Sequence, residues 1–165
     1  MSFQDLNRLK YSSRMRYIVI VLICLIMGGV AGFLAGCGGD TSVHEEALVT
    51  RVIDGDTVEL LDGQRVRYLC IDTPELGEDY YDEASRRNME LVQGKVVELW
   101  TGLENRDVYG RLLRFVFVDG TFVNAELVAE GLATAYIFNP DERYSQLFIQ
   151  LEEYARMKDI GLWSQ

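Results

Sequence analysis

An uncharged run of 23 residues, between Arg16 and Asp40, divides this chain of 165 residues into two parts. Its centre, residues 18–27, is ten strongly apolar residues in a row. Residues 1–36 hold four basic residues and one acid, a net charge of +3, whereas residues 37–165 hold 12 basic and 25 acidic residues, a net charge of −13. A basic head, an apolar stretch and an acidic body belong in different environments, so a globular fold is expected only after the run.

The first part has the features of an export signal: a basic start, a short apolar segment and small residues at its end. The tetrapeptide Leu34-Ala35-Gly36-Cys37 follows directly and resembles a bacterial lipobox, in which the chain is cut before the cysteine and a lipid is attached to its sulfur. Cys37 is therefore predicted to be a lipidation site. Alternatively, the run could span a bilayer as an uncleaved single-pass anchor, and plain secretion is a third possibility. Both leading interpretations place the body outside the cytoplasmic membrane, attached to it.

The domain boundaries follow from these features. Residues 1–36 are predicted to be a signal peptide or membrane anchor, residues 37–46 a linker, and residues 47–165 one folded domain. A composition of 48% hydrophobic and 25% charged residues excludes a mainly disordered chain. His44, the single histidine, is predicted to be a solvated linker residue, and Cys70 a thiol buried on the inner face of a strand.

Segments rich in β-branched residues alternate with turns that contain Asp and Gly. Five strands are predicted at residues 48–53, 57–61, 65–71, 95–101 and 112–118, and three helices at residues 80–93, 124–130 and 144–158. In the first helix, Ala84, Met89 and Val92 are expected to form the buried face. A helix after the third strand and further helices at the end indicate an α+β fold, a five-stranded Greek-key β-barrel of the OB type with about three helices.

Three short segments carry more paired charge than strands and turns require. They are residues 53–58, which contain Asp54-Gly55-Asp56; residues 67–75, which begin at Arg67 and end in Asp72-Thr73-Pro74-Glu75; and residues 107–111, which begin at Asp107 and end in Tyr109-Gly110-Arg111. Taken singly, each has a structural explanation, as a hairpin turn, a helix start or a turn into a strand. Together, in this order and on a barrel-like pattern, they resemble the staphylococcal nuclease-like (thermonuclease) family, an OB-fold group of calcium-dependent phosphodiesterases. The resemblance runs from about Leu48 to Trp163 and includes residues 123–133.

The resemblance implies a site for one Ca²⁺ ion. Asp56 and Asp72 resemble its carboxylate ligands, and the backbone carbonyl of Thr73 resembles a third protein ligand. Asp54 resembles a supporting carboxylate of its turn rather than a ligand. A hard divalent cation held by oxygen atoms would neutralise the charge of a phosphodiester and polarise it. With two carboxylate ligands, such a site is expected to be weak without substrate.

The resemblance also implies the groups that act on the substrate. Glu75 resembles the residue that positions or deprotonates the attacking water. Arg67 and Arg111 resemble the pair that grips the scissile phosphate, for which planar guanidinium groups are suited. Tyr109 and Tyr136 resemble groups near a terminal phosphate or base of the substrate.

The strand pattern does not explain how two side chains of the second charged segment could reach the same site. Arg67 and Asp72 are five residues apart, so an ideal strand would point them to opposite faces. Both can serve one site only where the chain bends or bulges between them, or where Asp72 lies past the end of the strand. The Thr73-Pro74 break favours the second arrangement.

The chain departs from the family pattern in its charge. Residues 76–82 form a short, acidic segment, where the family loop is often longer and basic. Val108 stands where the family often has a basic residue, and Phe138 where some members have a second Tyr. Since nucleic-acid affinity comes largely from phosphate neutralisation, the net charge of −13 predicts weak substrate binding with the core chemistry intact. The same charge would also suit a saline habitat.

The sequence therefore predicts an extracytoplasmic, membrane-tethered nuclease that hydrolyses phosphodiester bonds of DNA, RNA or both with Ca²⁺, and no protein partner. The alternative is a non-catalytic OB-fold lipoprotein that binds nucleic acid or another ligand. A nuclease needs a complete set of five residues, whereas a protein that only binds has no need to keep all of them. The five are Asp56, Arg67, Asp72, Glu75 and Arg111.

Overall fold

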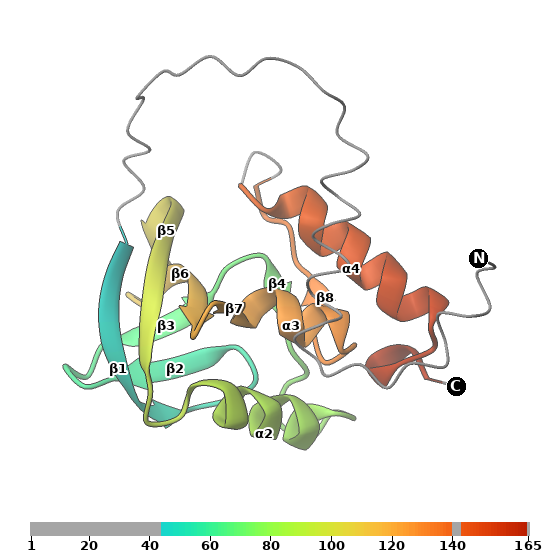
Figure 1. Ribbon diagram of the computed structural model, residues 1–165, viewed down its shortest axis with the longest axis horizontal. Coiled ribbons are helices and arrows are strands. Elements are labelled where there is room, and N and C mark those ends of the chain that lie inside the picture. Colours follow the sequence, from blue (N-terminus) through green and yellow to red (C-terminus); the bar gives the residue numbers. More distant parts are fainter. Residues whose placement is uncertain (1–43, 140–142, 165) are drawn as a thin grey trace, which may run out of the picture. The chain divides into compact units, whose positions relative to one another are not determined.

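The computed structural model describes residues 44–139 and 143–164 (Figure 1). The predicted signal segment 1–36, the predicted lipidation site Cys37 and the first part of the predicted linker lie outside these residues. Across the part of the chain that is described, no helix combines the length and the apolar character that crossing a bilayer requires.

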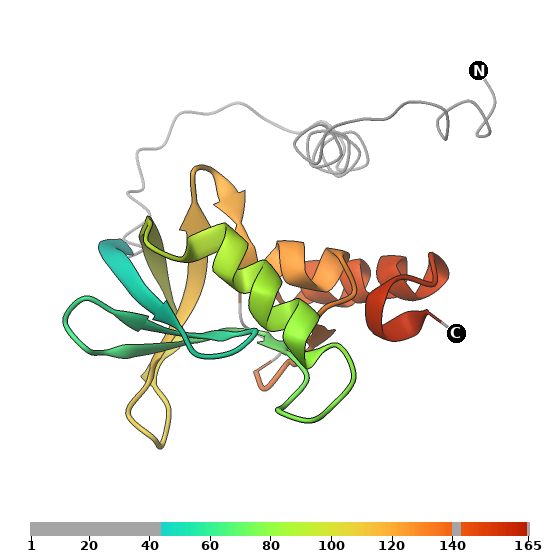
Figure 2. The ribbon, with the colours of Figure 1, turned by 90° about the horizontal axis from the view of Figure 1, so that it is seen from below.

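Five strands close into a barrel (Figures 1 and 2). β1 (His44–Val52) pairs antiparallel with β2 (Thr57–Leu60) on one side and with β5 (Val96–Arg106) on the other. β2 pairs with β3 (Arg65–Tyr68), and β5 with β6 (Leu112–Val118), again antiparallel. β3 and β6 then pair in parallel, which closes the ring. This strand order is a Greek-key barrel, so the prediction of an α+β OB fold is confirmed.

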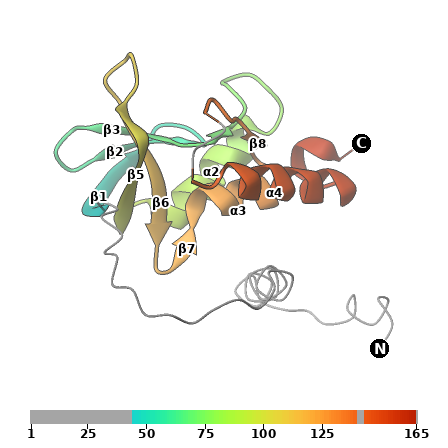
Figure 3. The same cartoon turned by 90° about the horizontal axis from the view of Figure 1, so that it is seen from above.

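Three helices and several short elements complete the domain. They are β4 (Ile71–Asp72), α2 (Tyr81–Val92), β7 (Thr121–Phe122), α3 (Val123–Ala129), β8 (Thr134–Ala135), α4 (Ser145–Met157) and the 3₁₀ helix η2 (Gly161–Trp163). α3 packs against β6 and lies between the barrel and α4 (Figures 1 and 3), while α2 contacts β1 and α3. β4 and β8 form a separate two-stranded antiparallel sheet.

An aromatic cluster fixes α4 to the barrel. Phe115 of β6 stacks on Phe148 of α4 with ring centroids 6.2 Å apart, and Tyr144 meets the Phe115 ring edge-on at 4.8 Å. Phe115 and Phe148 are almost completely buried, and burial of one such side chain contributes about 1.5–3 kcal/mol. The cluster therefore anchors the N-terminal part of α4 against β6.

The first strand begins earlier than the sequence predicts. Residues 44–46, part of the predicted linker 37–46, belong to β1 and pair with β5. His44 is exposed as predicted, but its ring stacks on Trp100 with the centroids 5.1 Å apart, so it is part of the folded domain rather than of a linker.

The structure also differs from two predictions for the folded domain. The predicted strand 65–71 is divided into β3 and β4, because Cys70 adopts a left-handed backbone conformation (φ 62°) that lies outside regular strand geometry. The Cys70 side chain is buried, as predicted. In α2, Met89 is 49% exposed and was wrongly assigned to the core; the buried position beside it is taken by Asn88.

Candidate active site

The charged segments singled out in the sequence meet at one cavity of about 720 Å³ on the barrel. Eight of the nine predicted site residues line it: Asp54, Asp56, Arg67, Asp72, Glu75, Tyr109, Arg111 and Tyr136. The ninth, Thr73, does not line the cavity, but its backbone amide donates a hydrogen bond to Asp56 Oδ2. Residues separated by up to 82 positions in the sequence are thus brought to one place by the closed barrel.

The turn between β1 and β2 holds Asp56 in place. The amides of Ile53 and Asp54 donate to the carbonyl of Thr57, and the Asp56 amide donates to Asp54 Oδ1 at 3.1 Å. Asp54 thus accepts a hydrogen bond within the turn. Gly55 faces the neighbouring segment so closely that a Cβ atom there would lie 2.6–2.8 Å from the side chain of Thr73. Only glycine allows the two segments to approach in this way.

The carboxylate of Asp56 is buried, and each of its oxygens accepts a hydrogen bond. Only 5% of the residue is exposed. Oδ1 accepts a hydrogen bond from the Thr57 hydroxyl at 3.1 Å, and Oδ2 accepts one from the Thr73 amide at 3.0 Å. Burial raises the pKa of Asp56 to about 6, because the nearby Arg67 guanidinium offsets only part of the desolvation and Asp54 adds repulsion. This carboxylate is therefore easier to protonate than an ordinary one.

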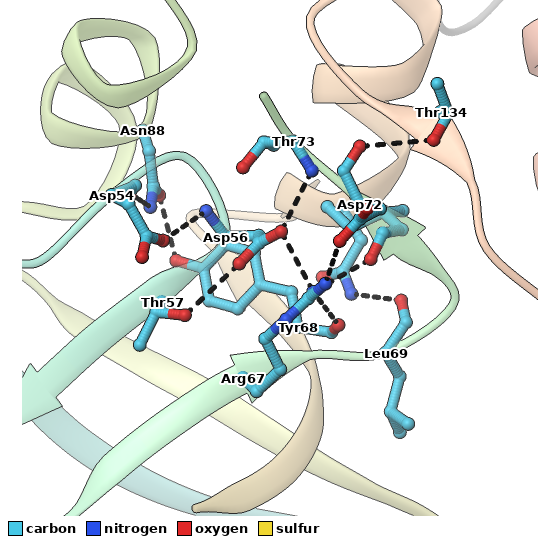
Figure 4. Close-up of polar contacts among 12 residues, drawn as sticks. Asp54, Asp56, Thr57, Arg67, Tyr68, Leu69, Asp72, Thr73, Asn88 and Thr134 are labelled. Carbon is cyan, nitrogen blue, oxygen red and sulfur yellow. Dashed lines mark hydrogen bonds and ion pairs between the residues drawn. The ribbon is translucent and has the colours of Figure 1, made fainter. Parts of the chain in front are cut away.

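Arg67 joins the two carboxylates that were predicted to bind metal. Its Nη1 lies 3.0 Å from Asp56 Oδ2, and its Nη2 lies 2.5 Å from Asp72 Oδ1 (Figure 4). The same guanidinium donates to the carbonyls of Tyr68 and Ile71 at 2.9 and 2.8 Å. Asp72 reaches this side because β3 ends at Tyr68 and the chain turns at Cys70 before β4. The structure thus has Asp72 beyond the strand, with a sharp bend in between.

The donor set around this point fits a hard cation. The carboxylates of Asp56 and Asp72 converge on one guanidinium, and the backbone of Thr73 adjoins both residues. Within residues 44–139 and 143–164, no group of three or more His, Cys, Asp and Glu side chains is arranged as a metal site. An ion held by two carboxylates and a carbonyl would complete its coordination with water and substrate oxygens, as Ca²⁺ commonly does.

Arg111 is held by Asp107, which begins the third charged segment but for which the sequence predicts no separate role. Asp107 Oδ2 accepts from Arg111 Nε at 2.6 Å, and Oδ1 accepts from the amides of Arg111 and Tyr109 at 2.9 and 3.0 Å. Burial acts to raise the pKa of Asp107, but these hydrogen bonds and the Arg111 charge outweigh it, so the pKa is lowered. Arg106 ties the same loop to the β2–β3 hairpin through the Gly110 carbonyl and the Gln64 side chain.

The outer part of the cavity is exposed and largely apolar. Glu75 is exposed on the loop after β4, and its amide donates to Glu78 Oε2. Tyr136 is 56% exposed and is fixed through its amide, which donates to the Cys70 carbonyl at 3.0 Å. Five large exposed side chains form this rim: Leu103, Val108, Tyr109, Tyr136 and Phe138. Such a surface offers contact area rather than charge to a ligand.

Comparisons with known proteins agree with this geometry. A family described as staphylococcal nuclease homologue matches residues 65–165. Endonuclease YncB of Bacillus subtilis (strain 168) is 40% identical over 126 residues, covering 70% of this chain and 60% of that protein. The SPbeta prophage-derived endonuclease YokF of the same strain is 38% identical over 131 residues, covering 73% and 44%. Thermonuclease of Staphylococcus intermedius is 32% identical over 166 residues, covering 94% and 99%. The chain thus spans about half the length of the two Bacillus proteins.

Proposed function

Because this chain belongs to the staphylococcal nuclease family, we propose that it is a calcium-dependent nuclease that hydrolyses phosphodiester bonds of DNA, RNA or both. The observation that carries the proposal is the convergence of two carboxylates and Arg67 on one point, in a cavity that also contains Glu75 and Arg111. A protein that only binds nucleic acid would have no need of this combination.

In the proposed site, Asp56, Asp72 and the Thr73 carbonyl hold one Ca²⁺ ion. When bound, the ion neutralises negative charge on the phosphodiester and polarises it towards attack. The protein contributes a buried, prearranged anchor in Asp56 and a more hydrated one in Asp72, whose side chain is 49% exposed. The hydrated ligand leaves room for water and substrate on the open side of the cavity.

Arg67 and Arg111 form the proposed phosphate clamp. Each guanidinium is already oriented by the protein, Arg67 by two backbone carbonyls and Arg111 by Asp107. Donors that are fixed before the reaction need little reorganisation as charge develops on the phosphate oxygens. Glu75, exposed at the edge of the cavity, is proposed to accept the proton of the attacking water.

Tyr109 and Tyr136 are proposed to contact the bases or a terminal phosphate of the substrate. The neighbouring rim supports contact with bases, because Val108 and Phe138 are 94% and 80% exposed and carry no charge. Stacking on apolar and aromatic groups is attractive for every base. It also compensates for the repulsion that an acidic protein exerts on a polyanion.

We further propose that the nuclease is attached to the outside of the cytoplasmic membrane through lipid on Cys37. The support is the sequence alone: a basic start, an apolar segment and the Leu34-Ala35-Gly36-Cys37 tetrapeptide. A retained single-pass helix is the alternative form of attachment.

The function is tested with the full chain in detergent, on labelled single-stranded DNA and RNA, with Ca²⁺ or with a chelator. Wild type should cleave only with Ca²⁺, and Glu75→Gln should lose about 10²–10⁴-fold in kcat. Asp79→Asn is the matched control, an acid of the same loop that does not line the cavity. Binding without cleavage in wild type would favour the non-catalytic alternative. A folded Glu75→Gln protein with more than a tenth of wild-type activity would remove Glu75 from the mechanism.

A further inference from the structure

A buried side-chain amide links α2 to the turn that carries Asp56. Asn88 is completely buried. Its Oδ1 accepts a hydrogen bond from the Tyr68 hydroxyl at 2.9 Å, and its Nδ2 donates to the backbone carbonyl of Asp54 at 3.0 Å (Figure 4). Both ends of the amide are therefore used, and both partners belong to segments that build the site.

Packing alone does not account for an amide at this position. The other buried residues of α2 are Ala84, Leu91 and Val92, so Asn88 is the polar member of an apolar face. A buried amide is costly unless its donor and acceptor are both bonded. Burial also raises the pKa of Tyr68 well above its ordinary value, so this phenol stays protonated and donates. The pair is a satisfied polar network inside the core.

The network holds Asp56 from two directions. Asn88 fixes the carbonyl of Asp54, directly before Gly55, and the amide of Tyr68 donates to the Asp56 carbonyl at 2.9 Å. The Tyr68 carbonyl in turn accepts from Arg67. Between these two points, Gly55 lies so close to Thr73 that a Cβ atom on it would overlap the Thr73 side chain. The turn that carries Asp56 is thus hydrogen-bonded on one side to α2 and on the other to β3.

We propose that Asn88 is a positioning residue of the divalent-cation site, acting through the Asp54 carbonyl and Tyr68 on the carboxylate of Asp56. The presence of a cation at this site rests on the proposed function. The role of Asn88 in placing the turn rests only on the hydrogen bonds described above. Partners behind a metal ligand commonly change metal affinity by 10- to 100-fold when they are removed.

The test compares three variants of the full chain: Asn88→Leu, which keeps the branched shape and removes both hydrogen bonds; Tyr68→Phe, which removes one hydroxyl; and Leu91→Ala. The last is the control, because it creates a cavity on the same buried face of α2 and breaks no hydrogen bond of the turn. Thermal melting first gives the melting temperature of each variant. Amide hydrogen exchange without metal and calorimetric Ca²⁺ titration are then measured at the same interval below that temperature.

Asn88→Leu should speed exchange of the Asp56 and Tyr68 amides by about tenfold or more over the control. It should also raise the Kd for Ca²⁺ by about tenfold, with a smaller change in the same direction for Tyr68→Phe. Equal exchange and equal Kd in Asn88→Leu and Leu91→Ala would overturn the inference. If Asn88→Leu does not fold, the comparison of Tyr68→Phe with Leu91→Ala decides the question, because Tyr68→Phe removes the hydrogen bond to Asn88 and keeps the buried ring. Absence of Ca²⁺ binding in wild type would refute the proposed function, while the exchange data would still decide the role of Asn88.

Discussion

Replacement of Asp56 by Asn should stabilise the metal-free protein at neutral pH. Burial raises the pKa of Asp56 from 3.8 to about 6 in the folded protein, whereas an unfolded chain keeps the ordinary value. Between these two pH values the folded protein binds more protons than the unfolded one, so the free energy of unfolding decreases as pH rises. The destabilisation is absent below about pH 3.8 and complete above about pH 6.

The magnitude follows from the same shift. About two pK units at 1.36 kcal/mol each correspond to about 3 kcal/mol at pH 7. The shift already includes the attraction of Arg67, which keeps its ion pair with Asp72 in the variant. The amide oxygen of the Asn can still accept from the Thr73 amide, but its NH₂ group replaces an acceptor oxygen, which reduces the gain. A net gain of about 1–3 kcal/mol is therefore expected. For a domain of this size, that gain corresponds to an increase of roughly 4–12 °C in melting temperature.

The assay is thermal melting of wild type and Asp56→Asn from pH 4 to pH 8 in chelator, and again in saturating Ca²⁺. In chelator the gain should be near zero at pH 4 and reach its plateau above pH 6. Ca²⁺ should raise the melting temperature of wild type and leave that of the variant unchanged. Asp72→Asn, at a half-exposed position beside the same arginine, is the control and should gain far less. A variant that melts at or below wild type in chelator at pH 7 would refute the reasoning.

Four other changes test separate parts of the structure. Gly55→Ala should lower stability by about 1–3 kcal/mol in chemical unfolding, because its methyl group would overlap Thr73; an unchanged midpoint would mean that the contact relaxes freely. Asp107→Ala should lower kcat/KM about tenfold or more in steady-state assays by releasing Arg111, with a near-normal melt. The value of kcat/KM should hold or rise as salt is first added, since screening weakens repulsion by the acidic body, and a steep fall from the lowest salt would contradict this. Cys37→Ala should abolish fatty-acid labelling in cells, and equal labelling would exclude lipidation at this residue.

The barrel was predictable because its strands are short, β-branched and separated by Asp-Gly turns. The boundary at His44 was not, because His44, Glu45 and Glu46 lack strand character in isolation. They are held by tertiary contacts: all three pair with β5, and Glu45 lies 3.2 Å from the buried Arg114. Local propensity is overridden here by cross-strand partners that the sequence does not identify.

The candidate site was also only partly predictable from the sequence. Seven of the eight predicted residues that line the cavity lie in the three charged segments, where acids, arginines and a tyrosine near turns are conspicuous in a sequence. The eighth, Tyr136, was implied by the family resemblance alone. The bend at Cys70 was hidden, because a cysteine gives no signal of a left-handed backbone. Asn88 was overlooked for a different reason: its place in the apolar spacing of α2 was visible, but the partners that explain it lie 20 and 34 positions away.

The parallel pairing of β3 with β6 has a consequence for the order in which the site is made. Val66 and Leu112 are 46 positions apart, so the pairing requires closure of a long loop that includes α2 and β5. Asp56, Arg67 and Asp72 lie near the N-terminal end of this loop, and Arg111 lies at its C-terminal end. During synthesis, which proceeds from the N-terminus, a partial chain contains the acidic half of the cavity before the second arginine exists. The complete constellation therefore arises only after β6 has been made and has joined the sheet.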